Sequence, residues 1–205
     1  DDIAIYGYSK TAAQILSDYN SVSFPILYFP FEDNVSGDGK IIIDASGNEN
    51  NGTTHWGANA SGMDCTIVGK MGGGCLFDGT GDFIDLGNST NFHIQDTMTI
   101  TGWFKTSASG VRQMIMQKGD ALIGYEWVIE VDVNNKLSAH FNPGNSGSTV
   151  YAKVSSQTVI DGAWHHFAAV YYVNPASEDI ALYLDGQEET VVIVDQRATR
   201  NYGTN

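Results

Sequence analysis

The chain has 205 residues, a length that suits a single domain with one sizeable hydrophobic core. Lys and Arg number 10 against 24 Asp and Glu, which gives a formal net charge of −14. Nucleic acids and anionic membranes are bound through cationic surfaces, so this charge argues against both as partners. The chain also contains no apolar run of membrane-spanning length, and we expect no membrane insertion. The acidic composition fits solubility alone, cation binding or a salty habitat.

The first 20 residues predict a strand followed by a short helix. Residues 3–8 alternate between two faces, as a strand does. Thr11 and Gln14 have the spacing of a capping box, and apolar residues follow at helical intervals as far as Tyr19. No other stretch of the sequence gives a convincing helix.

Beyond residue 25, apolar runs of five to nine residues alternate with turn residues. Turn chemistry recurs about every 10 residues. Pro30, inside the first run, favours a position at a sheet edge or a bulge. The pattern predicts an all-β fold, a two-sheet antiparallel β-sandwich (jelly roll) with one short N-terminal helix. Strands are expected at residues 26–31, 98–104, 113–117, 125–131, 137–141, 149–153, 164–172, 180–184 and 190–194.

A glycine-rich stretch at residues 69–87 is the feature around which the chain is organised. Glycine and aspartate separate its apolar pieces at residues 75–77 and 83–84. Glycine supplies positive-φ corners, and aspartate accepts hydrogen bonds from the turn that it opens. We therefore expect the two pieces to be strands joined by a tight turn.

Cys65 and Cys75 are the only cysteines, and no further Cys or His pair stands at zinc spacing. The alternatives are a disulfide across a hairpin and two free buried thiols. We prefer the disulfide, which would indicate an oxidising, extracellular compartment. Sequons permit glycosylation at Asn34, Asn51, Asn59 and Asn88.

Seven motifs occur in an order that matches one known family. They lie at residues 29–33, 44–52, 69–79, 82–85, 98–104, 161–167 and 182–186. In this order they resemble a laminin-G-like jelly-roll domain of the concanavalin A-like lectin/glucanase superfamily. The resemblance covers residues 26–194 and implies a β-sandwich from a superfamily that contains both sugar-binding proteins and enzymes.

The two ends of the chain depart from the family pattern. Family members usually close with a strand and a short helix, which residues 1–20 resemble, whereas residues 21–205 resemble a domain without its last strands. Three explanations fit: a tandem array cut out of phase, a permuted domain closed by its own N-terminal strand, or donation of that strand to a neighbouring copy. We favour the array or donation, in which Ile3, Ile5 and Tyr6 would carry assembly.

Oxygen-bearing side chains indicate a calcium site. Asp44 and Asn48 belong to a loop with such side chains at alternate positions, as wrapping around Ca²⁺ requires. The alternative is an Asx-rich turn without metal. The resemblance implies a second set, because related jelly-roll domains often hold a structural calcium between the first and last strands, where Glu32 or Asp33 and Asp2 are the matching acids. Structural Ca²⁺ is therefore the expected cofactor.

Aromatic side chains are the candidates for binding a sugar, because sugars stack on exposed rings. The candidates are Trp56, Tyr125, Trp127 and Tyr151. Trp56 stands beside His55 in a loop rich in Gly and Asn. It is either an exposed platform or a lid that folds onto the protein.

Glu130 and Asp132 invite a catalytic interpretation because they have the same-face spacing of a strand. Related glucanases carry a Glu-x-Asp-x-x-Glu strand for retaining hydrolysis, but the third position here is Asn135, so the proton donor is missing. A solvated strand face is the preferred interpretation. His165 and His166 would point to opposite strand faces and cannot share a metal, and we expect one to be packed and the other exposed.

We therefore predict an extracellular structural or adhesive module without enzymatic activity, a repeat or subunit of a cell-surface protein or filament. Its partners would be copies of itself or neighbouring repeats. The alternative is a calcium-dependent carbohydrate-binding module of an adhesin or extracellular enzyme, with glycans as partners, and a glycoside hydrolase is third. The chain begins within a motif, which predicts that it is a piece of a longer protein.

Overall fold

A computed structural model describes residues 3–7, 9–18, 25–57, 62–92, 97–120, 124–141, 151–172 and 179–189. Nearly all of its regular elements are strands, and one short α-helix follows the first strand, so the predicted all-β fold is confirmed. In chain order the elements are β1 (Ile3–Tyr6), α1 (Ala12–Asp18), β2 (Leu27–Phe29), β3 (Ile41–Ile42), β4 (Gly52–His55), β5 (Asp64–Val68), β6 (Gly73–Leu76), β7 (Phe83–Asp85), the 3₁₀ turn η1 (Thr90–Phe92), β8 (Thr97–Lys105), β9 (Gln113–Asp120), β10 (Gly124–Val131), β11 (Lys136–Phe141), β12 (Tyr151–Thr158), β13 (Trp164–Tyr172), β14 (Asp179–Leu184) and β15 (Gln187–Glu188).

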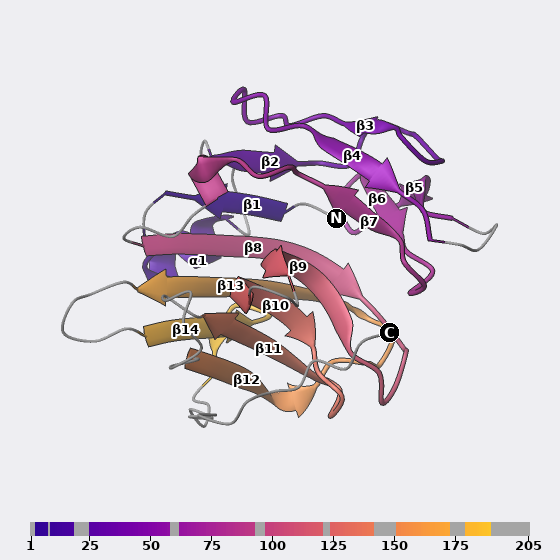
Figure 1. Ribbon diagram of the computed structural model, residues 1–205. Coiled ribbons are helices and arrows are strands. Elements are labelled where there is room, and N and C mark those ends of the chain that lie inside the picture. The colour runs from indigo at the N-terminus through magenta and orange to yellow at the C-terminus, as the bar shows by residue number, and fades with distance from the viewer. Residues whose placement is uncertain are drawn as a thin grey trace.

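Two antiparallel sheets make the sandwich. One has the strand order β15-β14-β13-β8-β1-β2, and the other, which lies in front of it in Figure 1, has the order β12-β11-β10-β9. Two small sheets, β3-β4-β7 and β5-β6, stand beyond β2 at one end of the molecule. Apolar side chains from both large sheets form one core, including Ile100, Ile129, Phe141 and Phe167.

The alternation of β13 shows how the six-stranded sheet is covered on both faces. Phe167 and Tyr171 face the sandwich core, whereas Ala168 and Val170, on the opposite face, pack against Ile15 of α1. Neighbouring residues of a strand point to opposite faces, so α1 forms a third layer behind this sheet (Figure 1).

The capping box predicted at the start of the helix is present. The Thr11 backbone N–H donates to Gln14 Oε1 at 2.8 Å, and the Gln14 N–H donates to Thr11 Oγ1 at 3.2 Å. These two bonds satisfy N–H groups that a helix start leaves without internal partners. The helix begins directly after Thr11, as the pattern predicts.

The N-terminal strand β1 lies inside a sheet of its own chain. Ile3 pairs with Phe29 of β2 and with Gly102 of β8, so both edges of β1 are hydrogen-bonded. Ile5 is fully buried in the core. In this structure β1 therefore closes the sandwich of its own chain. The same contacts made between two copies would give the array or the donation arrangement.

The glycine-rich stretch differs from its prediction. Its apolar pieces do form β6 and β7, but β6 pairs with β5 and β7 pairs with β4, so they belong to different sheets instead of one hairpin. The partner strand β4 was missed because its sequence, Gly-Thr-Thr-His, has no apolar alternation. Pro30 follows β2 at the edge of the large sheet, as predicted. The strand expected at residues 190–194 lies outside the described residues.

Candidate functional site

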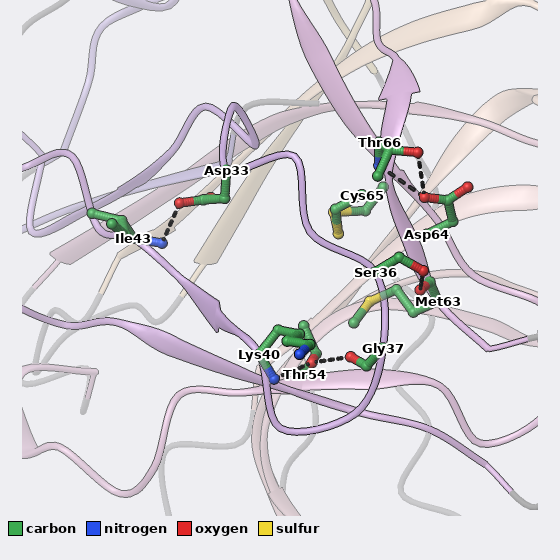
Figure 2. The surroundings of a disulfide bond; sticks show 11 residues. Asp33, Ser36, Gly37, Lys40, Ile43, Thr54, Met63, Asp64, Cys65 and Thr66 are labelled. Carbon is green, nitrogen blue, oxygen red and sulfur yellow. Dashed lines mark hydrogen bonds between the residues drawn. A yellow bond between two sulfur atoms is a disulfide. The ribbon is translucent and has the colours of Figure 1, made fainter.

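A disulfide joins Cys65 of β5 to Cys75 of β6, as the sequence predicts (Figure 2). The hairpin lies tightly against the chain that follows β2. A Cβ at Gly73 would stand 2.0 Å from the carbonyl oxygen of Phe31, so only glycine allows this approach. The Gly73 N–H donates to Glu32 Oε1 at 3.0 Å. One carboxylate oxygen of Glu32, a predicted calcium ligand, thus holds the hairpin in place.

Asp33 has one carboxylate oxygen in use and one without a partner. Oδ1 accepts the N–H of Ile43 at 3.1 Å (Figure 2), whereas Oδ2 is buried and accepts no hydrogen bond. A buried anionic oxygen without a partner is costly, and it suits the hard oxygen ligation of calcium. Asp2, its predicted co-ligand, lies outside the described residues.

Asp44, the other predicted calcium ligand, organises its own loop. Its Oδ1 accepts the N–H groups of Tyr28 and Ser46, both at 2.9 Å. Its Oδ2 accepts the Ser46 hydroxyl at 2.8 Å and the Asn50 N–H at 3.0 Å. Burial by itself raises the pKa of Asp44, but the hydrogen bonds from Tyr28, Ser46 and Asn50 outweigh it and hold the pKa below the ordinary 3.8.

Asn48 completes this loop with its side-chain amide. Its Nδ2 donates to the carbonyl oxygens of Pro25 and Ile26 at 3.2 and 3.1 Å. The carboxylate of Asp44 already accepts four hydrogen bonds from the chain, and a metal ion bound there would have to replace these donors. Among the residues that the structure describes, no group of three or more His, Cys, Asp or Glu side chains is placed to hold a metal ion. Among the predicted calcium ligands that the structure describes, Asp33 fits the ion best, because it has a carboxylate oxygen without a hydrogen-bond partner.

Trp127 is not an exposed sugar-binding residue, and this prediction was wrong. Its side chain is 2% exposed and belongs to the sandwich core, where its Nε1–H donates to the carbonyl oxygen of Phe92 at 3.1 Å. Residues 127, 129 and 131 all face inward because they alternate along β10. Tyr125 and Tyr151 lie in β10 and β12, and their side chains are outside the described part of the structure.

Trp56 remains partly accessible, with 38% of its surface exposed. Its ring lies across Gly62, where an added Cβ would come within 2.1 Å of it. The side chain is therefore packed on one side and open on the other. Next to it, the rings of His55 and Phe83 stack with their centroids 4.8 Å apart, and Phe83 is 52% exposed. These aromatic side chains give the small β3-β4-β7 sheet a partly apolar surface.

The described sequon asparagines lie at the surface. Asn34, Asn51 and Asn88 are exposed, and Asn59 is outside the described residues. The side-chain oxygens of Asn51 and Asn88 accept hydrogen bonds from the Asp44 N–H and from Lys118 Nζ, respectively. Glycosylation of these residues stays a prediction.

A buried polar cluster surrounds Glu130, and the sequence did not predict it. Glu130 is 1% exposed, so the expectation of a solvated strand face was wrong. Its Oε2 lies 3.2 Å from Arg112 Nε, and its Oε1 lies 3.2 Å from His140 Nε2 without accepting a hydrogen bond. Ser138 Oγ, opposite Glu130 on β11, stands 2.7 Å from the same His140 nitrogen. A buried carboxylate is stable here because a guanidinium compensates its charge.

This cluster does not have the geometry of a nucleophilic relay. Such a relay places the hydroxyl and the carboxylate on different nitrogens of the imidazole, whereas Ser138 and Glu130 both approach Nε2 of His140. Asp132 and Asn135 serve the β10–β11 turn instead. Asp132 Oδ1 accepts the N–H groups of Asn134 and Lys136, and Asn135 has a φ of 67°.

The pair His165–His166 is only partly as predicted. The two rings do lie on opposite faces, His165 beside Phe104 and His166 edge-on to Trp103, but both residues are buried, at 8% and 5% exposure. The expectation of one exposed histidine was wrong. His165 is reached by two carboxylates: Asp185 Oδ2 lies 2.8 Å from Nδ1, and Asp161 Oδ1 lies 3.0 Å from Nε2.

The family model for the concanavalin A-like lectin/glucanases superfamily, Laminin_G_3, matches residues 78–205. The chain belongs to this superfamily. The match begins after β6, so β1, α1 and the disulfide hairpin precede the matched residues of this laminin-G-like chain. No curated protein and no solved structure matches it. The described part of the chain contains no helix long and apolar enough to cross a membrane.

Proposed function

We propose that this laminin-G-like sandwich is an extracellular structural or adhesive module that joins copies of itself, or neighbouring repeats, through its N-terminal strand. The observation that carries the proposal is the position of β1 between β2 and β8. This strand fills an interior place of the six-stranded sheet and adds Ile5 to the core.

The place that β1 fills is a groove that cannot stay empty. Without β1, the facing edges of β2 and β8 would expose unpaired N–H and C=O groups. The core would also lose Ile5 and the partly buried Ile3. A strand from another copy would restore the same bonds and the same apolar contacts, because exchange of identical elements changes only which chain supplies them.

Two observations support an extracellular location. The Cys65–Cys75 disulfide is typical of oxidising compartments. Laminin-G-like domains are typically extracellular. The absence of enzymatic activity is part of the proposal, and the shared nitrogen in the Glu130 cluster supports it.

Strand exchange can be tested with cysteines placed at paired positions. Ala4 of β1 is the partner of Thr101 of β8. A chain carrying Ala4→Cys and a second chain carrying Thr101→Cys, unfolded and refolded together at high concentration in an oxidising buffer, should give a disulfide-linked dimer on a non-reducing gel. Peptide mapping would locate the new bond and show that the native Cys65–Cys75 disulfide is kept.

Lys105→Cys is the matched control for Thr101→Cys. Lys105 also lies on β8, but it pairs with Trp164 and lies outside the part of β8 that pairs with β1. The Ala4→Cys and Lys105→Cys mixture should stay monomeric. Only monomers from the Ala4→Cys and Thr101→Cys mixture, with each chain folded, would mean that the strand closes its own sandwich and would refute joining by exchange.

The proposal includes a structural calcium ion bound by Asp33, and the buried Oδ2 of this residue, which accepts no hydrogen bond, supports a cation there. Millimolar Ca²⁺ should raise the melting temperature of the wild type and not that of Asp33→Asn. Asp44→Ala is the matched control. It should lower the free energy of unfolding by about 2 kcal/mol, because it leaves part-buried N–H donors without an acceptor, and it should keep the response to calcium. An equal calcium response in Asp33→Asn would exclude this residue as the ligand.

Glycan binding is the second candidate function, and the exposed side of Trp56 beside the stacked His55 and Phe83 rings favours it. Retention of the monomeric chain on a glycan array, reduced by Trp56→Ala, would support this function. If the chain assembles with other copies and is not retained on the glycan array, the result would support the structural module and not glycan binding.

A further inference from the structure

His165 carries hydrogen-bonding contacts on both ring nitrogens. Asp185 Oδ2 lies 2.8 Å from Nδ1 and Asp161 Oδ1 lies 3.0 Å from Nε2. A carboxylate oxygen only accepts, so both nitrogens must carry a hydrogen to satisfy both contacts. A neutral imidazole has one N–H and would leave a lone pair facing one carboxylate. The geometry therefore selects the imidazolium.

The two aspartates come from different parts of the chain. Asp161 lies in the loop before β13, and Asp185 lies at the turn between β14 and β15. Asp185 is held in place twice more, because its Oδ1 accepts the His166 N–H at 2.9 Å and its own N–H donates to the His166 carbonyl oxygen at 2.8 Å. His165 thus bridges the loop to the turn at the end of the six-stranded sheet.

The turn that His165 holds also positions the edge strand of that sheet. β15 is only two residues long and pairs with β14 through Glu188 and Gln187. Glu189, the next residue, accepts the Ser156 N–H of β12 at 2.8 Å and so ties the turn to the other sheet. A covered edge cannot pair with another strand, whereas a released edge presents unpaired backbone groups.

We propose that His165 is a proton-dependent latch: its imidazolium clamps Asp161 to Asp185, and loss of its proton loosens the β14–β15 turn and uncovers the edge of β14. The neighbours of the ring are Phe104 of β8, the two aspartates and the adjacent His166. Lys105 of β8 pairs with Trp164, next to the histidine.

The electrostatics agree with this geometry. Burial alone lowers the pKa of His165, but the hydrogen bonds and charges of Asp185 and Asp161 outweigh it and set the pKa above the ordinary 6.5. The sign follows from linkage: the clamp stabilises the fold below pH 6.5 and its contribution is lost as the pH rises through the raised value. The pKa of His166 is lowered to about 4, chiefly by burial, so this neighbour stays neutral over that interval.

The first test is a nitrogen NMR titration of the histidine rings, with His165→Gln to assign the signal. At pH 6 both ring nitrogens of His165 should be protonated, and the titration midpoint should lie above 6.5. Asp161→Asn, at an exposed side chain, should lower that midpoint, because it removes one of the two carboxylates that favour the imidazolium. A neutral His165 ring at pH 6, or a midpoint unchanged in Asp161→Asn, would overturn the latch.

The second test reads the turn itself by amide hydrogen exchange at pH 5.5 and pH 8.5, corrected for intrinsic rates. Protection of the amides of Asp185 and Glu189 should fall at the higher pH, while β10 amides keep theirs. In His165→Gln the two amides should lose this pH dependence and show the weaker protection at both pH values. Equal protection at both pH values in the wild type would reduce the contacts to a static structural feature and refute the proposal.

Discussion

Replacing Trp127 by alanine should lower the free energy of unfolding by about 4 kcal/mol, which is the usual cost of truncating a buried tryptophan. The indole is 2% exposed and fills the core between the sheets, so its removal leaves a cavity that the neighbouring strands cannot close. The Phe92 carbonyl oxygen would also lose the hydrogen bond from Nε1. Urea unfolding followed by circular dichroism measures the change.

Two further variants separate the parts of this effect. Trp127→Phe keeps most of the apolar volume and loses the N–H, so it should cost about 1 to 2 kcal/mol. Trp56→Ala, at a residue that is 38% exposed, should change stability by about 1 kcal/mol or less. A stable, cooperatively folded Trp127→Ala would contradict the burial of this residue and return it to the surface candidates.

Acidification should destabilise the protein through His166. Burial on the outer face of the six-stranded sheet lowers the pKa of this histidine to about 4, despite the opposing charge of Asp185, while the unfolded chain keeps a pKa near 6.5. The unfolded state therefore binds the proton first. The contribution of His166 to stability is complete above pH 6.5 and is lost between pH 6.5 and 4, by a total of about 3 kcal/mol.

Urea unfolding at a series of pH values between 7 and 4 measures this loss, and His166→Phe is the comparison. The variant keeps a ring beside Trp103 and cannot titrate, so the wild type should lose about 3 kcal/mol more than the variant over the interval. Carboxylates that titrate near pH 4 act on both proteins and cancel in the difference. Parallel stability curves for the two proteins would contradict the lowered pKa. His165 does not interfere, because its contribution changes above pH 6.5.

Structural features that depend on residues close together in the sequence could be predicted from the sequence. The capping box between Thr11 and Gln14 needs residues only three apart, and it forms as the pattern requires. The disulfide closes a hairpin whose cysteines are 10 residues apart. The longest strands, β8 and β13, were found because a run of apolar, β-branched and aromatic residues is a local property.

Pairings between distant strands were decided only by the tertiary structure. β6 and β7 are adjacent in the sequence, yet each pairs with a different partner, because the packing of Gly73 against Phe31 and of Gly52 against Phe29 and Ile84 places them in separate sheets. The self-closing position of β1 is likewise a property of the whole sandwich. Family resemblance alone left three arrangements open.

The candidate site was the least predictable part, because burial depends on what covers each face. In the sequence, Glu130 looks the same whether its strand face is solvated or covered. Only the tertiary structure shows that it is buried, with Ser138 opposite it on β11 and Arg112 compensating its charge. Trp127 differs from Trp56 in the same way: the residue type is identical, and the side of the strand or loop on which each ring lies decides whether it meets core or solvent. Local chemistry thus determined the strands, the helix cap and the disulfide. The fold determined which polar and aromatic groups meet, because those contacts join residues that the sequence keeps far apart.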